Sequence, residues 1–122
     1  MNATLEKKTT EPKLGLDGIV ADRMQKLIIA FDVDGTLVSE DDVPCMQYIW
    51  MLQTLSKLTK NVRIVVWSGG GKEYAEMWGR RLGLDDYVWK YMAKDRDFHV
   101  DVAFDDQQAF ALADKNIIVR LK

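Results

Sequence analysis

Two aspartates, Asp32 and Asp34, lie where an apolar segment of the chain runs into a glycine turn at Gly35. The segment from Leu27 to Val33 is apolar almost without interruption, which is typical of a strand covered on both faces in a parallel sheet. Ligands of such sheets bind beyond the carboxyl ends of the strands, so both carboxylates stand where phosphoryl-transfer chemistry can be built. A plain Asp-Gly turn is the alternative, and it explains Asp34 and Gly35 but not Asp32.

A second apolar segment, Val62–Trp67, ends in Ser68 and three glycines, Gly69–Gly71. A hydroxyl and exposed backbone amides at the start of a helix form a cradle for phosphate, and glycines let the backbone approach a ligand closely. A serine that merely caps the following helix explains the same residues without a ligand. We therefore predict Ser68 and Gly69 as phosphate-binding residues and keep the helix cap as the alternative.

A third segment, Val100–Phe104, ends in Asp105 and Asp106, one of which could instead cap a helix that begins near Gln107. If these strands are neighbours, four carboxylates converge, those of Asp32, Asp34, Asp105 and Asp106. At about 4 Å and an effective dielectric constant near 20, each like-charged pair costs about 4 kcal/mol. Mg²⁺ relieves such repulsion and prefers oxygen ligands, so these four residues are predicted to form a Mg²⁺ site.

A lysine in the same region would neutralise a bound phosphate or an aspartate nucleophile. Lys94 is the candidate because it precedes the paired acids, and Lys90 or Lys72 could take its place. Lysines are commonly just solvated, so the sequence leaves the choice among the three open.

The order of these groups, from Asp32-Val33-Asp34-Gly35-Thr36 through Ser68-Gly69 and Lys94 to Asp105-Asp106, resembles the four motifs of the haloacid dehalogenase superfamily. The resemblance covers the chain from about Leu27 to its end. It implies that Asp32 is a nucleophile that becomes an aspartyl-phosphate and that Asp34 is the general acid and base. It also implies that Ser68 and Lys94 hold the phosphoryl group, that Asp32, the Asp34 carbonyl and Asp105 bind Mg²⁺, and that Asp106 assists through water or hydrogen bonds. The second aspartate favours a phosphatase over a dehalogenase.

Neither interval where the family carries a cap domain is long enough for one here, so the resemblance implies a small, capless member with an open site. Similar capless members act on macromolecules or use a partner subunit as a lid, and short examples occur in phage genomes. The expected substrate is therefore a phosphomonoester, and a phosphorylated nucleic-acid end or a nucleotide is the expected kind. Specificity is then expected from the flap Val38–Pro44, from the surface around Arg80, Arg81 and Arg96, or from a second subunit of a homo-oligomer.

Two other classes of function stay open. A catalytically weak phosphate- or metal-binding regulatory module, working as a subunit of a larger complex, would carry the same residues. A receiver domain of two-component signalling also combines acids, a hydroxyl, a lysine and Mg²⁺, but its acidic pair follows the first strand and its phosphoacceptor a middle strand. The order in this chain is different.

Bulk composition fits a single globular domain inside the cell. The chain has 122 residues, 48% of them hydrophobic and 30% charged, which is ordinary for a globular protein. The net charge of −2 gives no overall attraction for nucleic acid. A single cysteine, Cys45, excludes an internal disulfide framework, and the absence of an apolar leader or membrane-length segment predicts a cytoplasmic protein.

The acids, Ser68 and Lys94 can meet at one edge of a sheet if strands and helices alternate along the chain, because parallel strands all end at the same edge. We expect a flexible tail over residues 1–16 and one domain over residues 17–122. Alternation predicts a three-layer α/β/α sandwich with a mainly parallel sheet and no cap domain. The expected strands are Leu27–Val33, Val62–Trp67, Tyr87–Met92, Val100–Phe104 and Ile117–Leu121; the expected helices are Gly18–Lys26, Cys45–Lys60, Lys72–Leu82 and Gln107–Asp114.

Overall fold

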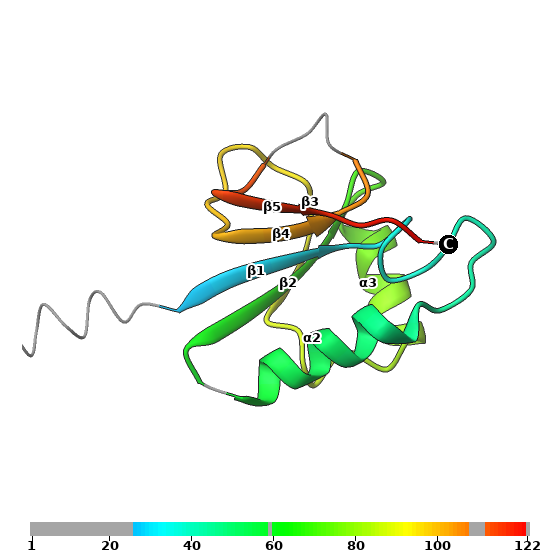
Figure 1. The fold of residues 1–122 in the computed structure, drawn as a ribbon, viewed down its shortest axis with the longest axis horizontal. Coiled ribbons are helices and arrows are strands. Elements are labelled where there is room, and N and C mark those ends of the chain that lie inside the picture. The colour runs from blue at the N-terminus through cyan, green and yellow to red at the C-terminus, as the bar shows by residue number, and fades with distance from the viewer. Residues whose placement is uncertain (1–25, 59, 108–111, 122) are drawn as a thin grey trace, which may run out of the picture.

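The structure is a computed structural model that describes residues 26–58, 60–107 and 112–121. These residues form a five-stranded, all-parallel sheet with the strand order β3-β2-β1-β4-β5 (Figure 1). The elements are β1 (Leu27–Asp32), α2 (Met46–Leu58), β2 (Val62–Ser68), α3 (Lys72–Arg81), β3 (Lys90–Ala93), β4 (Val102–Asp105) and β5 (Lys115–Ile118). The small α/β fold with a parallel sheet that the sequence predicts is confirmed.

The central strands are buried on both faces, as their continuous apolar sequence requires. In β1 the last four residues are buried, and in β2 the last five. Phe31 of β1 stacks on Phe104 of β4, with ring centroids 4.7 Å apart and planes 8° from parallel. This contact joins the two strands directly before their acidic ends.

Both helices pack on the same face of the sheet, and Figure 1 shows α2 below the strands. Leu52 of α2 and Trp78 of α3 share one core cluster with Phe31 and Val66 of the sheet. A second core cluster lies on the opposite face of the sheet and includes Val65. Segments before β4 and before β5 contribute further members to it: Phe98, Val100, Leu112 and Ala113. The described part of that second cluster comes from loops and strands, so a further helical layer and the absence of a cap remain predictions.

Several element boundaries differ from the sequence expectation by one to three residues; the strand expected from Val100 begins at Val102, and the strand expected to reach Leu121 ends at Ile118. The strand expected from Tyr87 begins at Lys90, because the backbone N–H groups of Tyr87 and Val88 donate to the carbonyl of Leu84 and close a turn there. The strand expected from Ile117 begins two residues earlier, since pairing with β4 outweighs the polarity of its first residues. Leu112–Asp114 are not helical, and the rest of the helix expected there lies largely outside the described residues.

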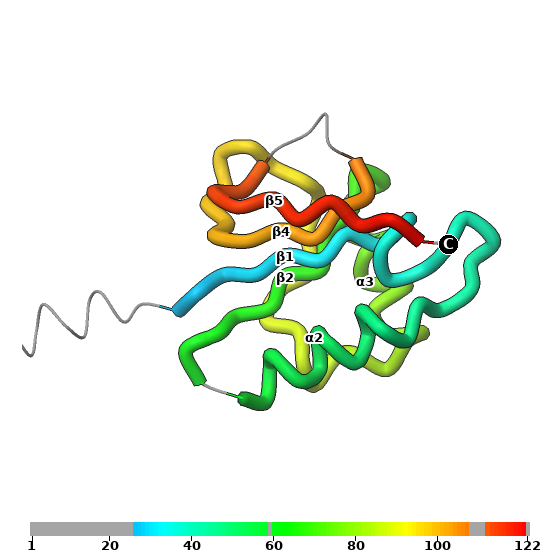
Figure 2. The backbone as a smooth tube through the Cα atoms, in the orientation of Figure 1, coloured from blue at the N-terminus to red at the C-terminus, as the bar shows by residue number. Residues whose placement is uncertain are grey.

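The segments expected at the N-terminus lie outside the described residues. These are the tail over residues 1–16 and, except for its last residue, the helix over Gly18–Lys26. The C-terminal segment after β5 is described to residue 121, and Figure 2 shows it in red beside the cyan loop that follows β1. The backbone N–H of Val119 donates to the carbonyl of Asp105 (2.8 Å), which holds this segment at the carboxyl edge of the sheet.

Helix α3 approaches β3 closely at Gly79. A Cβ atom at this position would lie 2.1 to 2.4 Å from three atoms of the Tyr91 side chain. The Tyr91 hydroxyl donates to Asp85 (2.7 Å), so the ring is not free to swing away. The absence of a side chain at Gly79 therefore sets the distance between helix and strand.

We expect Gly79→Ala to destabilise the fold by about 1–3 kcal/mol, since overpacking costs this much in a close-packed interior. Thermal unfolding followed by circular dichroism measures it. Gly69→Ala is the matched control, because a Cβ there would meet no atom within 4 Å. Equal melting temperatures for Gly79→Ala and the unmodified chain would contradict this prediction and show that the Tyr91 side chain can move aside without cost.

Candidate phosphate and metal site

The predicted acids lie at the carboxyl edge of the sheet. Asp32 ends β1 and Asp105 ends β4, and these strands are hydrogen-bonded neighbours. From β1 the chain continues to β2 on one side, whereas from β4 it continues to β5 on the other. Where neighbouring strands have diverging connections, a crevice opens outside their carboxyl ends, and ligands of open α/β sheets bind there. The topology thus places Asp32 and Asp105 at the expected binding position.

Asp106 completes a cluster with these two residues. One carboxylate oxygen from each of Asp32, Asp105 and Asp106 lies within 4.8 Å of the other two. Asp32 and Asp105 are only 4% and 5% exposed, so solvent screens their repulsion weakly. The backbone N–H of Gln107 donates to Oδ1 of Asp105 (2.9 Å) and fixes that carboxylate. Three of the four acids predicted as metal ligands are thus brought together.

Lys94 reaches the cluster from the end of β3. Its Nζ lies 2.6 Å from Oδ2 of Asp105 and 3.1 Å from Oδ1 of Asp32. Its backbone N–H donates to the carbonyl of Ser68 at the end of β2 (3.1 Å), which fixes the point from which the side chain starts. Lys90, the first residue of β3, lies instead near aromatic rings. Of the lysines considered from sequence, Lys94 is the one in contact with the acids.

Burial raises the pKa of Asp32 to about 7; the charge of Lys94 opposes this rise and that of Asp105 adds to it. Burial by itself lowers the pKa of Lys94, but its hydrogen bond to Asp105 and the charge of Asp32 outweigh burial, so its pKa is raised. Burial and a hydrogen bond with Asp105 also raise the pKa of Asp106. The ammonium of Lys94 thus pairs with two of the three clustered carboxylates, and either a proton or a bound cation would offset the repulsion that is left.

Asp34 stands apart from this cluster. Its side chain is exposed, and Oδ1 accepts a hydrogen bond from the hydroxyl of Tyr74 in α3 (2.8 Å). The hydrogen bond to Asp34, with a smaller contribution from burial, raises the pKa of the Tyr74 hydroxyl. The four-carboxylate site expected from sequence is therefore divided, with three acids in one cluster and Asp34 turned toward α3. That position suits proton transfer at the edge of the site better than metal ligation by the side chain.

The turn after β1 is pressed against the cluster. Gly35 has φ 82°, and a Cβ there would lie 2.2 Å from Oδ2 of Asp106. Its backbone N–H donates to the carbonyl of Val38 (2.7 Å), and Leu37 donates to the carbonyl of Asp32 (3.3 Å). Glycine is thus required both by the backbone conformation and by the space. Thr36 is fully buried beside it, and within the described residues its hydroxyl has no hydrogen-bond partner.

Ser68 is buried at the end of β2, and its hydroxyl accepts the backbone N–H of Gly70 (2.9 Å). The cap position of α3 is Gly71, and no side chain caps this helix. The helix-cap explanation for Ser68 is therefore not supported. Gly69 is exposed, has no atom within 4 Å of a would-be Cβ, and lines a hollow beside Lys94.

The donor set fits a hard cation. All three clustered groups offer carboxylate oxygens, which Mg²⁺ prefers, and the described residues place no cysteine or histidine with them as Zn²⁺ favours. Asp32, Asp105 and Asp106 are the residues that would hold the ion. The identity of that ion as Mg²⁺ stays a prediction.

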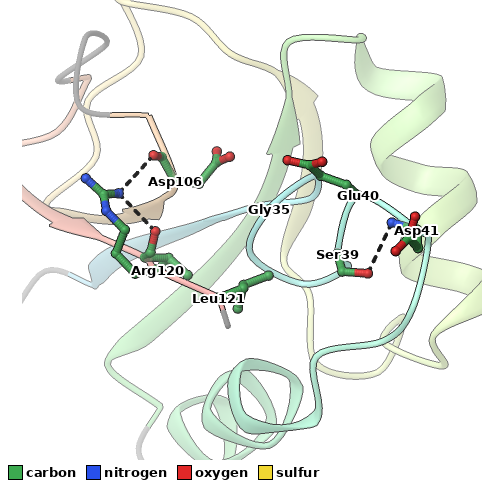
Figure 3. Close-up of a pocket in the computed structure, with 8 residues that line it drawn as sticks. Gly35, Ser39, Glu40, Asp41, Asp106, Arg120 and Leu121 are labelled. Atoms are coloured by element: carbon green, nitrogen blue, oxygen red, sulfur yellow. Dashed lines mark hydrogen bonds between the residues drawn. The ribbon is translucent and has the colours of Figure 1, made fainter.

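Two hollows flank the cluster. The first, about 360 Å³, lies between the flap (Val38–Pro44) and the C-terminal segment. Figure 3 shows Asp106 and Arg120 on one side of it and Ser39, Glu40 and Asp41 of the flap on the other. The second hollow, about 260 Å³, is lined by Gly69, Lys94, Arg96, Gln107 and Leu112. The site is accessible from both sides.

Comparisons of the chain with protein-family models, curated proteins and solved structures found no match. None of the helices in the described part of the chain is both long and apolar enough to cross a bilayer.

Sequence reasoning missed two contributors to the site. Tyr74 holds Asp34, and its only signal is its position in the first turns of a helix that follows the Ser68 loop. The backbone N–H of Gln107 donates to Asp105. Nearly every residue has a backbone N–H group, so the residue type gives no sign of which one will donate. Both depend on how separate segments meet in space.

In metal-free buffer we expect the free energy of unfolding to fall as pH rises from about 4 to about 7. The pKa of Asp32 is about 7 in the folded chain against 3.8 for the unperturbed group. The folded state therefore binds the proton more strongly, and stability is lost as that proton leaves, by at most about 1.4 kcal/mol per pH unit. Urea unfolding at pH 5 and pH 8 with EDTA measures this. Asp32→Asn should flatten the dependence; an equally steep loss in that variant would assign it to other groups.

Proposed function

We propose that the protein is a Mg²⁺-dependent phosphomonoester hydrolase that works through an aspartyl-phosphate on Asp32. The observation that carries this is the buried pair of Asp32 and Asp105 at the carboxyl edge of the sheet, with the ammonium of Lys94 within 3.1 Å of both. The arrangement also supports the resemblance to the haloacid dehalogenase superfamily, and a cytoplasmic location is part of the proposal.

In the first step a carboxylate oxygen of Asp32 attacks phosphorus, and the bond from phosphorus to the ester oxygen breaks. Lys94 and the open backbone at Gly69 bind the oxygens of the transferring group. Asp34 donates a proton to the departing alkoxide, a role typically worth about 10²–10⁴-fold in rate. Covalent capture divides one difficult displacement into two easier ones.

In the second step water attacks the phosphorus of the aspartyl-phosphate while Asp34 takes its proton. The bond between Asp32 and phosphorus breaks, and inorganic phosphate leaves. Tyr74 holds Asp34 through its 2.8 Å hydrogen bond and keeps the carboxyl group at the edge of the site. Asp34 thus returns to its starting protonation state.

When bound, Mg²⁺ supplies positive charge that keeps Asp32 ionised near neutral pH and offsets repulsion between that carboxylate and the phosphate. Asp32, Asp105 and Asp106 would hold it. Burial raises the pKa of Asp32 to about 7, so a bound cation would increase the fraction of the nucleophile that is ionised at neutral pH.

We expect Asp32→Asn to abolish hydrolysis of p-nitrophenyl phosphate in Mg²⁺ buffer while the fold is kept, since the amide has the same shape and no nucleophilic oxygen. Asp86→Asn, at an exposed acid outside the cluster, is the control and should retain full activity. Release of p-nitrophenol measures both. Near-normal turnover in Asp32→Asn would reject the covalent mechanism, and phosphate binding without turnover by the unmodified chain would favour the regulatory module.

We expect Tyr74→Phe to lower kcat severalfold with little change in KM, because Asp34 loses the hydrogen bond that orients it. The loss should be smaller than in Asp34→Asn, which removes the proton-transfer group itself. Tyr91→Phe is the matched control, since it also removes a tyrosine–aspartate hydrogen bond, to Asp85, outside the site. Equal kcat values for Tyr74→Phe and Tyr91→Phe would deny Tyr74 a positioning role.

A further inference from the structure

We propose that single-stranded nucleic acid binds across the second hollow and the loop after β3. Its phosphorylated end would lie at Asp32, and its following bases would stack on a cluster of side chains at the start of β3. We call this group the aromatic–basic cluster, and its members are Arg63, Trp89, Lys90 and Phe98. The position of the phosphorylated end rests on the proposed phosphatase site; the binding surface rests on the contacts below.

The aromatic–basic cluster interleaves cations with rings. The guanidinium carbon of Arg63 lies 4.6 Å from the ring centroid of Trp89. Nζ of Lys90 lies 5.8 Å from that centroid and 5.3 Å from the centroid of Phe98. Trp89 is 44% exposed, and in the part of the chain that the structure describes neither Arg63 nor Lys90 pairs with a carboxylate. A base can stack on such a ring while the cations meet phosphates.

Strand β3 leads from this cluster toward the acids. Lys90 begins β3, and Lys94 follows its end, so the two are separated by about 13 Å at about 3.3 Å per residue. This is the length of about four stacked nucleotides at about 3.4 Å each. The loop then carries Arg96, which lines the second hollow, and returns to Phe98 beside Lys90. Cations and rings therefore lie at one end of the path, and Lys94 and Arg96 lie at the other.

Charge decides which hollow a polyanion uses. The first hollow is lined by Glu40, Asp41 and Asp106 against one cation, Arg120, whose Nη1 already donates to two backbone carbonyls. Among the described residues, the lining of the second hollow contains no acid and two cations, Arg96 and Lys94, of which Lys94 is already paired with Asp32 and Asp105. The second hollow is therefore less repulsive to a phosphodiester chain than the first, and Arg96 is the cation that can meet it.

Arg80 and Arg81 of α3, which the sequence suggested as substrate-binding cations, are less available to a polyanion than Arg63 and Lys90. Arg80 is paired with Glu76 (3.0 Å) and Asp85 (3.5 Å), and Arg81 lies over the ring of Trp78. Two acids, Asp95 and Asp97, also share the loop with Arg96. Affinity should therefore depend on stacking as well as on charge.

Fluorescence anisotropy with dye-labelled oligo(dT) and oligo(U) carrying hydroxyl ends tests the surface without hydrolysis. We expect affinity to rise from the dinucleotide to the tetranucleotide and to change little for the octanucleotide. Trp89→Ala should weaken tetranucleotide binding at least about fivefold, since loss of base stacking has this effect. Trp50→Ala removes another exposed tryptophan, on α2, and should bind as the unmodified chain does. Both variants should hydrolyse p-nitrophenyl phosphate normally.

Should Trp89→Ala fail to fold, the double variant Arg63→Gln, Lys90→Gln replaces it and should reduce the slope of log affinity against log salt. Equal binding by Trp89→Ala and Trp50→Ala, an unchanged slope in the double variant, or equal competition by polyglutamate would overturn the inference. Aryl-phosphate turnover without oligonucleotide binding would overturn this inference and leave the phosphatase proposal standing. Oligonucleotide binding without turnover would support the surface and count against the phosphatase proposal.

Discussion

Asp32 and Asp105 are buried side by side at the ends of two neighbouring strands, and the contacts around them must hold this pair of charges in place. Two carboxylates removed from water repel each other, and the ammonium of Lys94 offsets that repulsion only in part, since Asp106 adds a third negative group. Loss of one partner from such a buried set is costly because it leaves the remaining charges uncompensated. Burial raises the pKa of Asp32 to about 7; the charge of Lys94 opposes this rise, and the charges of Asp105 and Asp106 add to it. A site that destabilises its own ionised form is prepared for a cationic ligand.

The fold holds these charges at the edge of the sheet through apolar contacts immediately beneath them. Phe31 and Phe104 stack on adjacent strands one residue before the acids. Gly35 lets the next turn lie against Asp106 where any side chain would collide with it. The backbone of Lys94 is tied to β2. Four separate segments thus converge with little freedom, which is what preorganised electrostatic catalysis requires.

The sequence was sufficient for the strands that end in acids, because continuous apolar runs mark buried parallel strands and all such strands end at one edge. It could not choose between Lys94 and Lys90, since that choice depends on where β3 begins against β2. It also missed the contact between Tyr74 and Asp34, which depends on how α3 is rotated relative to the turn after β1. The start of β5 was set by pairing with β4 and not by its own polar first residues.

Mass spectrometry of the acid-quenched protein during turnover of an aryl phosphate shows whether Asp32 accepts the phosphoryl group. We expect one added phosphoryl group in the tryptic peptide from Leu27 to Lys57, placed on Asp32 by fragmentation and absent from the Asp32→Asn variant. Turnover with no phosphoryl group on this peptide under the same quench, or with the group on Asp34 or Asp105, would contradict it.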